Sequence, residues 1–289
     1  AIFLGKIKLN EKYYQKYYDR NYFKQTNNKA GVAAKLTEFF SYLSTKKKER
    51  LILKNLNNKN KISILDIGCG EGKFLEKLNP GKFDKFGLEI NSTAVENCKK
   101  KNISMFDQPL TSLDFKNKKF DVITFWHSFE HMENPLETFQ KINKVLSKNG
   151  ILILQTPNTK SLGFRFGREN WFHLDSPRHL FIYTEKAIDK LCQKTGFKLV
   201  KSINEFYDYP LDLFWSIRRS LIKYLFYPLY LIIKFFDAEH LTYFIKINGT
   251  KNSTNFFSFI HSFNLTNNIS SYQVTNVSLT PIPTNPATA

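Results

Sequence analysis

The stretch Ile64-Leu-Asp-Ile-Gly-Cys-Gly-Glu-Gly72 contains the feature that decides the fold of this chain. Its apolar residues predict a buried strand, and the three alternating glycines predict a tight turn that leads into a helix. Glycines at such a turn let the backbone bend sharply and approach a ligand closely. The spacing is GxGxG, because Lys73 stands where the dinucleotide fingerprint GxGxxG has its third glycine. No Lys-Ser or Lys-Thr pair follows the glycines, which excludes a nucleoside-triphosphate P-loop.

Two acidic residues strengthen the case for a nucleoside site at this turn. Asp66 precedes the glycines inside the predicted strand, and Glu89 ends the next predicted strand along the chain. An acid at the end of that second strand accepts hydrogen bonds from ribose hydroxyls. The turn and the two acids together predict a ligand that contains a nucleoside.

Predicted strands and helices alternate from residue 61 onward. The strands are expected at 62–67, 86–90, 103–106, 120–126, 151–155, 198–203 and 242–247, and the helices at 72–78, 92–100, 135–146 and 184–195. Alternation at this spacing indicates a parallel sheet that is covered on both faces by helices. We predict an α/β, Rossmann-like fold with a seven-stranded, mostly parallel sheet and a helical insertion between strands six and seven.

Composition divides the chain into further segments. Residues 1–60 are predicted to form an N-terminal helical lid or extension, because Tyr14, Tyr18 and Tyr22 fall on one helix face. Residues 61–247 form the predicted catalytic domain, which includes an apolar and basic insertion at 206–240. Residues 248–289 carry a single charged residue, Lys251, and are rich in Ser, Thr and Asn, so we expect a disordered tail.

The charge of the chain is strongly positive. The 289 residues include 43 Lys+Arg against 25 Asp+Glu, a net charge of +18, and 42% of them are hydrophobic, which excludes global disorder. Only seven of the basic residues are Arg, a bias that AT-rich coding DNA produces without any functional cause, so nucleic acid is not the favoured partner. The three cysteines lie far apart in the sequence, which excludes a disulfide scaffold and fits a reducing compartment.

At the glycine turn, Asp66 and Glu89 the sequence resembles the class I S-adenosylmethionine-dependent methyltransferases. The resemblance covers roughly residues 60–203 and the strand at 242–247. The resemblance implies S-adenosyl-L-methionine as the cofactor. It implies that the loop from Asp66 to Gly72 holds the methionine part, that Glu89 binds the ribose and that Ile90 lies beside the adenine. It also places Phe106 and Asp107 at the adenine, and we expect Trp126 and His127 to flank the methionine end. The implied cofactor-binding set is Asp66, Gly68, Cys69, Gly70, Gly72, Glu89, Ile90, Phe106, Asp107, Trp126 and His127.

Asn134-Pro135 and Leu146–Asn158 match further motifs of the class I family. The stretch Trp171–Leu180, followed by Tyr183-Thr184 and Gly196-Phe197, is similar to the subgroup that contains ubiquinone-type O-methyltransferases and methyltransferases of surface-glycan pathways. Some ubiquinone-type members bind a divalent metal through Glu-x-x-Glu-His. Here His127 stands in place of the first Glu, which argues against a metal, and we expect none. The segment His127–His131 also reads as HxxEH, a zinc-peptidase pattern, but it directly follows a strand instead of lying in a helix.

Histidines at the ends of two predicted strands are the candidates for a general base. The reaction expected from the resemblance transfers the methyl group of a sulfonium to a nucleophile. A hydroxyl nucleophile gains from a base whose pKa lies near neutrality. His131 follows the fourth strand, and His173 and His179 follow the fifth. Ligands bind at such strand ends in open α/β sheets. His179 is the first choice and His131 the second, with a purely structural role for His179 as the alternative.

The insertion suggests where the acceptor comes from. Residues 211–236 mix aromatic and aliphatic side chains with Arg218, Arg219 and Lys223, a pattern that suits a helix at a membrane interface or an apolar cap on the domain. We therefore expect a small-molecule, glycan or lipid-linked hydroxyl acceptor and a cytoplasmic enzyme with peripheral contact at the inner face of a membrane. The rivals are an RNA or protein methyltransferase and a non-catalytic protein that keeps the fold.

Overall fold

The computed structural model describes residues 2–3, 32–56, 59–205 and 240–249, which all lie in one compact unit, Ala1–Thr250. A second unit, Lys251–Ala289, lies outside the described residues. The predicted tyrosine face of residues 13–22, the insertion at 206–239 and almost the whole predicted tail also fall outside them.

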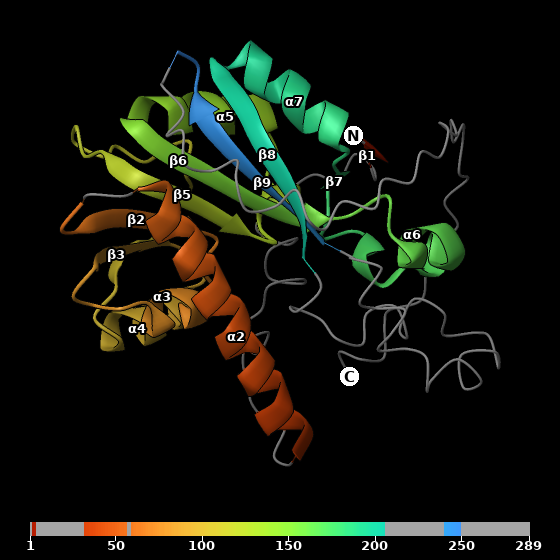
Figure 1. The fold of residues 1–289 in the computed structure, drawn as a ribbon, viewed down its shortest axis with the longest axis horizontal. Coiled ribbons are helices and arrows are strands. Elements are labelled where there is room, and N and C mark those ends of the chain that lie inside the picture. The colour runs from red at the N-terminus through yellow and green to blue at the C-terminus, as the bar shows by residue number, and fades with distance from the viewer. Residues whose placement is uncertain (1, 4–31, 57–58, 206–239, 250–289) are drawn as a thin grey trace. The chain divides into compact units, whose positions relative to one another are not determined.

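A seven-stranded sheet forms the centre of the described unit (Figure 1). Its strand order is β4-β3-β2-β5-β6-β9-β8. The strands are β2 (Ile62–Ile67), β3 (Phe83–Leu88), β4 (Ser104–Phe106), β5 (Phe120–Trp126), β6 (Leu146–Pro157), β8 (Phe197–Glu205) and β9 (His240–Ile247). The first five are parallel to one another, and β9 is antiparallel to both β6 and β8. The predicted seven-stranded, mostly parallel sheet is confirmed.

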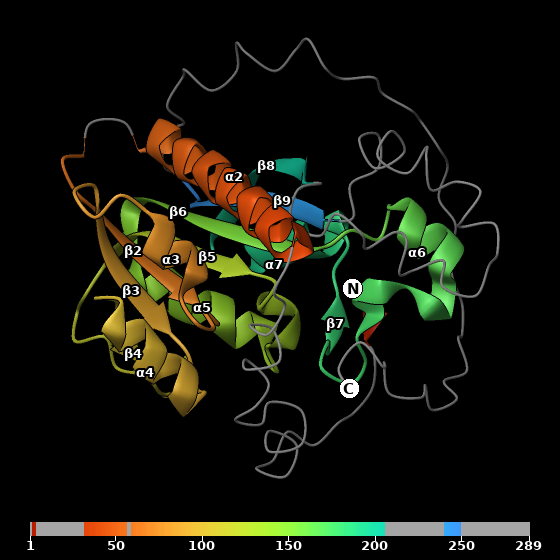
Figure 2. The ribbon, with the colours of Figure 1, turned by 90° about the horizontal axis from the view of Figure 1, so that it is seen from below.

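Helices cover both faces of the sheet, as Figures 1 and 2 show. One face carries α2 (Val32–Asn55), α3 (Lys73–Lys77) and α4 (Ser92–Lys100), and the other carries α5 (Pro135–Val145) and α7 (Glu185–Lys194). Local chemistry sets the helix starts: Asn91 caps α4 through a hydrogen bond from Ala94 N–H, and Asn134 caps α5 just before Pro135. No helix among the described residues is long and apolar enough to span a bilayer.

Two apolar cores flank the sheet, because successive side chains of a strand point to opposite faces. Ile64 of β2 belongs to the core beneath α2, α3 and α4, whereas its neighbour Leu65 belongs to the core beneath α5 and α7. Ile52 of α2 is fully buried in the first of these cores. The described part of the predicted N-terminal extension therefore packs on the sheet as one of its covering helices.

Several boundaries differ from the expected ones. β3 begins at Phe83 and ends at Leu88, so that Glu89 is the first residue beyond the strand. β6 extends to Pro157, because pairing with antiparallel β9 continues past the apolar run. His240, which we expected in the insertion, is the first residue of β9.

Smaller elements lie around the carboxyl ends of β5 and β6. They are η1 (Phe129–His131), α6 (Leu162–Gly167), η2 (Arg168–Asn170), η3 (Phe172–Leu174) and a short pair of strands, β1 (Ile2–Phe3) with β7 (Phe181–Ile182). The sequence predicts none of these, since such short elements leave no periodic pattern.

Candidate active site

The glycine turn joins β2 to α3 in the conformation that only glycine adopts easily. Gly68, Gly70 and Gly72 have φ values of 71°, 52° and 71°. A Cβ atom added at Gly68 would lie 2.5 Å from the Cβ of Ser128, whose hydroxyl donates to the carbonyl of Ile67 at 2.5 Å. The segment that follows β5 therefore packs directly against the turn, and a side chain at Gly68 would push the two apart.

Glu89 ties this turn to the end of β3. One carboxylate oxygen accepts a hydrogen bond from Gly70 N–H at 3.0 Å, and the other accepts from Ile90 N–H at 2.9 Å and Asn91 N–H at 3.0 Å. Two carboxylate oxygens offer about four acceptor positions, so three backbone donors leave capacity for one more. The carboxylate is thus fixed in place beside the turn with room for a further hydrogen-bond donor.

Asp66 is buried at the end of β2. Its carboxylate accepts a 2.7 Å hydrogen bond from the Thr124 hydroxyl of β5. Burial raises the pKa of Asp66 to about 7, even though Thr124 and the charge of Lys48 act in the opposite direction. A buried carboxyl group whose pKa lies near neutrality, at the carboxyl end of a parallel strand, is typical of functional sites.

Lys48 of α2 is a site residue that the sequence pattern does not reveal. Its Nζ lies 4.1 Å from the centroid of the Trp126 ring and donates to the Gln155 side chain at 3.0 Å. It also lowers the pKa of Asp66 through its charge. α2 thus brings a cation over the ends of β2, β5 and β6, and only tertiary packing shows it.

The residues predicted to contact the adenine lie in different surroundings. Ile90 is 49% exposed, unusual for a large aliphatic side chain, and the Asp107 carboxylate is also exposed. The Phe106 ring packs against Phe86 and Phe115, with ring centroids 6.3 Å and 5.1 Å away. Phe106, the last residue of the outer strand β4, therefore belongs partly to the apolar core.

Cys69 and Cys98 meet behind the turn, although they lie far apart in the sequence. Both sulfur atoms approach the carbonyl oxygen of Gly70, at 3.8 Å and 3.2 Å. A hydrogen bond between the two thiols, together with burial, raises the pKa of Cys69, and the same hydrogen bond lowers that of Cys98. A raised pKa disfavours the thiolate that a nucleophile needs, so Cys69 supports the loop instead.

A cluster of histidines surrounds one buried acid at the ends of β5 and β6. The central acid is Glu130 of η1, which is fully buried. Nδ1 of His127 lies 3.7 Å and Nε2 of His179 lies 3.9 Å from its Oε1 atom. Ring contacts extend the group, which we call the histidine cluster: His127, His131, His173, His179 and His240. Five of the six histidines of the chain thus gather at one place.

The backbone around the cluster fixes two of its rings. His131 Nδ1 lies 2.8 Å from the carbonyl oxygen of Arg178, and His179 Nδ1 lies 2.8 Å from that of His173. A carbonyl only accepts hydrogen bonds, so each Nδ1 carries the hydrogen and each neutral ring has its lone pair on Nε2. The guanidinium of Arg178 pairs with Asp175 at 2.6 Å, which stabilises the segment that holds both rings.

Burial has opposite consequences for the acid and the base of this cluster. Burial, and then the charge of His131, lower the pKa of His179 to about 4. Burial alone would raise the pKa of Glu130, but contact with His127 and the charges of His179 and His131 lower it to about 2. At neutral pH the expected state is an ionised Glu130 beside a neutral His179.

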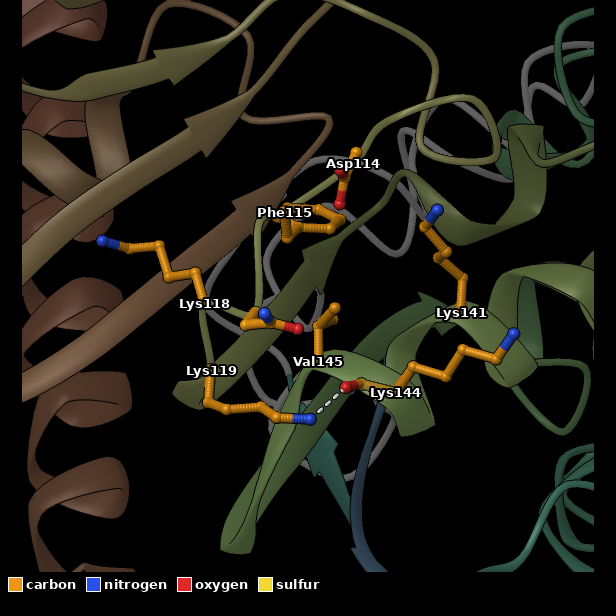
Figure 3. Close-up of a pocket in the computed structure, with 8 residues that line it drawn as sticks. Asp114, Phe115, Lys118, Lys119, Lys141, Lys144 and Val145 are labelled. Atoms are coloured by element: carbon orange, nitrogen blue, oxygen red, sulfur yellow. Dashed lines mark hydrogen bonds between the residues drawn. The ribbon is translucent and has the colours of Figure 1, made fainter.

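A hollow of about 220 Å³ lies at the opposite end of β5 and has no part in this arrangement (Figure 3). It lies beside Phe115, Val145 and four lysines, Lys118, Lys119, Lys141 and Lys144. Because ligands of open α/β sheets bind at the carboxyl ends of the strands, this hollow is not the candidate active site.

Comparison with known proteins identifies the class. A family described as "Methyltransferase domain" matches residues 34–202, more than half of the chain, and the chain belongs to this family. The fold agrees: the magnesium protoporphyrin IX methyltransferase of Synechocystis PCC 6803, solved with bound SAH, superimposes with a TM-score of 0.55 at 14% identity, over 81% of this chain and 99% of that one. The chain thus contains a methyltransferase domain with the class I methyltransferase fold, as predicted.

Two curated relatives match only part of their own length. The tRNA U34 carboxymethyltransferase of Campylobacter jejuni is 28% identical over 50% of this chain and 52% of that protein. The ubiquinone biosynthesis O-methyltransferase of Histophilus somni is 28% identical over 37% of this chain and 50% of that protein. The chain thus spans about half the length of the curated relatives it matches. The plantazolicin methyltransferase BpumL, solved with a monoazolic desmethylPZN analog and SAH, has a TM-score of 0.54 at 20% identity, over 81% of this chain and 93% of that one.

Proposed function

We propose that this protein transfers the methyl group of S-adenosylmethionine to a hydroxyl of a small-molecule, glycan or lipid-linked acceptor. One observation carries the proposal. The glycine turn with Asp66 and Glu89 lies at the carboxyl ends of the parallel strands, as the histidine cluster does, and Ser128 packs against Gly68 between them. A cofactor seated on the turn would present its methyl group toward the cluster.

Each predicted cofactor residue has a chemical role in this proposal. Glu89 binds the ribose through its remaining acceptor capacity, and Gly68, Cys69, Gly70 and Gly72 approach the cofactor through the backbone. Asp66 balances the positive charge of the methionine end, beside Trp126 and His127. Ile90 covers the adenine, which accounts for its exposure, and Asp107 accepts a hydrogen bond from the adenine amino group.

The reaction forms one bond and breaks one. The acceptor oxygen attacks the methyl carbon, the carbon–sulfur bond breaks with its electron pair passing to sulfur, and S-adenosylhomocysteine leaves. The hydroxyl proton passes to an imidazole nitrogen of the histidine cluster. The cofactor supplies the reactivity, so the chain mainly aligns oxygen, carbon and sulfur.

His131 is the better of the two proposed bases. It is half-buried, and its lone pair is on Nε2 because Nδ1 donates to a carbonyl. His179 is buried and its pKa is lowered to about 4, so it takes up a proton poorly near neutral pH. We assign proton removal to His131 and keep His179 as the second candidate.

The proposed acceptor class rests on the position of the insertion relative to the histidine cluster. Glu205 of β8 and His240 of β9 pair with one another, and His240 also pairs with Pro157 of β6. The two ends of the insertion are therefore anchored beside the histidine cluster. Residues 211–236, proposed to contact a membrane, lie outside the described residues, and that contact stays a prediction.

The test combines cofactor binding with methyl transfer. Full-length protein is titrated calorimetrically with S-adenosylmethionine, and tritium transfer is followed to catechol, glycoside and lipid-linked hydroxyl acceptors. Glu89→Ala should weaken cofactor binding at least about 30-fold, because a charged acceptor of several hydrogen bonds is lost. Binding without transfer to any hydroxyl acceptor would overturn the acceptor class, and absence of binding would leave a non-catalytic protein.

An RNA acceptor is the second candidate, which the match to the tRNA U34 carboxymethyltransferase favours. Unmodified tRNA therefore belongs in the same tritium assay. Transfer to tRNA, with binding that weakens steeply as salt rises, would establish this rival in place of a hydroxyl of a small molecule or glycan.

A further inference from the structure

The carboxylate of Glu130 lacks hydrogen bonds within the described part of the chain. It is fully buried, and neither oxygen has a hydrogen-bond partner among the described residues. Two imidazole nitrogens face it, Nδ1 of His127 at 3.7 Å and Nε2 of His179 at 3.9 Å, both beyond hydrogen-bond distance. Burying an ionised carboxylate without close partners is strongly unfavourable unless a positive charge compensates it.

The imidazoles that face this carboxylate cannot supply the charge while neutral. Nδ1 of His131 and of His179 each donates to a backbone carbonyl, so the lone pair of each ring is on Nε2. On the Glu130 side, His179 therefore presents an acceptor to another acceptor. Metal-binding histidines have the same arrangement, with one nitrogen held by a carbonyl and the other on the ion.

The three side chains are spaced so that a small side-chain rotation brings them to the distances of ligands around one ion. Glu130, His131 and His179 each offer a ligand atom, and the three atoms lie within 4.8 Å of one another. Two ligands that are each about 2.1 Å from the same ion lie roughly 3 to 4 Å apart. A distance of 3.9 Å is too long for a hydrogen bond and suitable for a shared cation.

We propose that Glu130, His131 and His179 bind one divalent transition-metal ion. This ligand set differs from the Glu-x-x-Glu-His pattern, in which His127 replaces the first Glu, because the third ligand comes from the distant segment that carries His179. Two neutral imidazoles and one carboxylate favour Zn²⁺, Fe²⁺, Co²⁺ or Mn²⁺ over Mg²⁺, which prefers oxygen ligands. Glu130 and His179 are buried and His131 is half-buried, so the ion would be open to a further ligand on one side.

The inference deepens the proposed function, on which it rests in one respect. A metal ion at this place supplies Lewis acidity, which lowers the pKa of an acceptor hydroxyl bound to it. In that case His131 would hold the ion instead of taking up the proton, and the hydroxyl proton, made more acidic by the ion, would pass to solvent water. Metal binding, however, requires neither cofactor nor acceptor and is measured without them.

Cobalt provides the direct measurement. Full-length protein, treated with a chelator and then freed of it, is titrated with Co²⁺ while visible absorption is recorded, and with Zn²⁺ and Mg²⁺ by calorimetry. We expect one ion per chain, d–d bands of a site with nitrogen and oxygen ligands, and Mg²⁺ binding at least about 100-fold weaker than Zn²⁺ binding.

Variants locate the ion. Glu130→Gln, which keeps the size of the side chain, and His179→Ala should each weaken Co²⁺ binding at least about 30-fold and change the absorption bands. His173→Phe is the matched control: it keeps an aromatic ring and the carbonyl that orients His179, and it should bind Co²⁺ within about 3-fold of the unaltered protein. S-adenosylmethionine binding in each variant shows that the fold is intact.

The outcomes separate the two ideas. Cobalt binding that survives in His179→Ala, or no stoichiometric binding to a protein that binds S-adenosylmethionine, overturns the metal site. If chelator-treated protein methylates a hydroxyl acceptor at an unchanged rate, the role of the ion in the reaction is overturned while the proposed function stands. Stoichiometric Co²⁺ binding that depends on Glu130 and His179, without transfer to any hydroxyl, supports the metal site and overturns the hydroxyl acceptor.

Discussion

The two halves of the candidate active site, which lies at the carboxyl ends of the parallel strands, are built in different ways. The proposed cofactor half, at the ends of β2 and β3, uses mostly backbone: three glycines at positive φ and three N–H groups that hold Glu89. The proposed acceptor half, at the ends of β5 and β6 and the start of β9, uses side chains: the five residues of the histidine cluster, with Glu130 close to His127 and His179. Backbone recognition suits a constant cofactor, whereas side chains can be changed to suit an acceptor.

The strongest test breaks the acceptor half alone. His131→Ala should lower the rate of methyl transfer by about 100- to 10,000-fold, the range expected when a positioned group that handles the proton is lost. The affinity for S-adenosylmethionine should stay within about 3-fold, because His131 belongs to the histidine cluster and its ring is held by the Arg178 carbonyl. Steady-state rates and calorimetry measure both quantities, and an unchanged rate would remove His131 from the mechanism.

A substitution in the cofactor half should do the reverse. Gly68→Ala places a Cβ at positive φ and 2.5 Å from the Cβ of Ser128, so the turn must shift. We expect cofactor affinity to fall about 30- to 100-fold, which corresponds to about 2–3 kcal/mol of strain. Gly81→Ala is the control, since Gly81 is exposed, is not at positive φ and lies outside the site. Equal affinity in both variants would show that the turn does not hold the cofactor.

Asp66 links the cofactor half to stability. Its pKa is about 7 in the folded protein against an ordinary value of 3.8, so the folded chain holds a proton that the unfolded chain releases. Stability from this group is full below about pH 4 and is lost as pH rises through 7, by up to about 4 kcal/mol. Asp66→Asn should therefore gain stability relative to the unaltered protein between pH 4 and 8. Urea unfolding at pH 4, 6 and 8 measures the difference, and a constant difference contradicts the assignment.

The smallest effect is expected where the two halves meet. Lys48→Met keeps the aliphatic stem but removes the charge near Asp66 and Trp126, and cofactor affinity should fall about 3- to 10-fold. Lys99→Met, an exposed change on α4, serves as the control and should leave the affinity unaltered. If the two variants behave alike, Lys48 has no role at the cofactor.

The two halves also differ in how well the sequence predicts them. The turn, Asp66 and Glu89 are recognisable because a strand, a glycine spacing and the next strand end lie within one short segment. The core strands and helices are predictable for the same reason, from local periodicity. Boundaries move where tertiary pairing overrides local pattern, as at β6, whose partner β9 lies far along the chain.

The histidine cluster can be anticipated only in pieces. His131, His173 and His179 are candidates because they follow strand ends, but nothing local indicates that His240 joins them or that Glu130 is at the centre. Lys48 escapes prediction for a related reason: a lysine in a polar helix has no distinguishing pattern, and its role depends on how α2 crosses the sheet. Cys69 and Cys98 likewise become neighbours only through packing.

The antiparallel direction of β9 has a consequence for how such an enzyme can diversify. Because β9 runs against its neighbours, the chain leaves the sheet at Glu205 and returns at His240, and these two residues pair with one another. The intervening segment can therefore lengthen, shorten or be exchanged between related enzymes without any change of strand register. New acceptor specificities can therefore arise, or be engineered, by replacing the segment between Glu205 and His240, while the glycine turn and Glu89 stay unchanged.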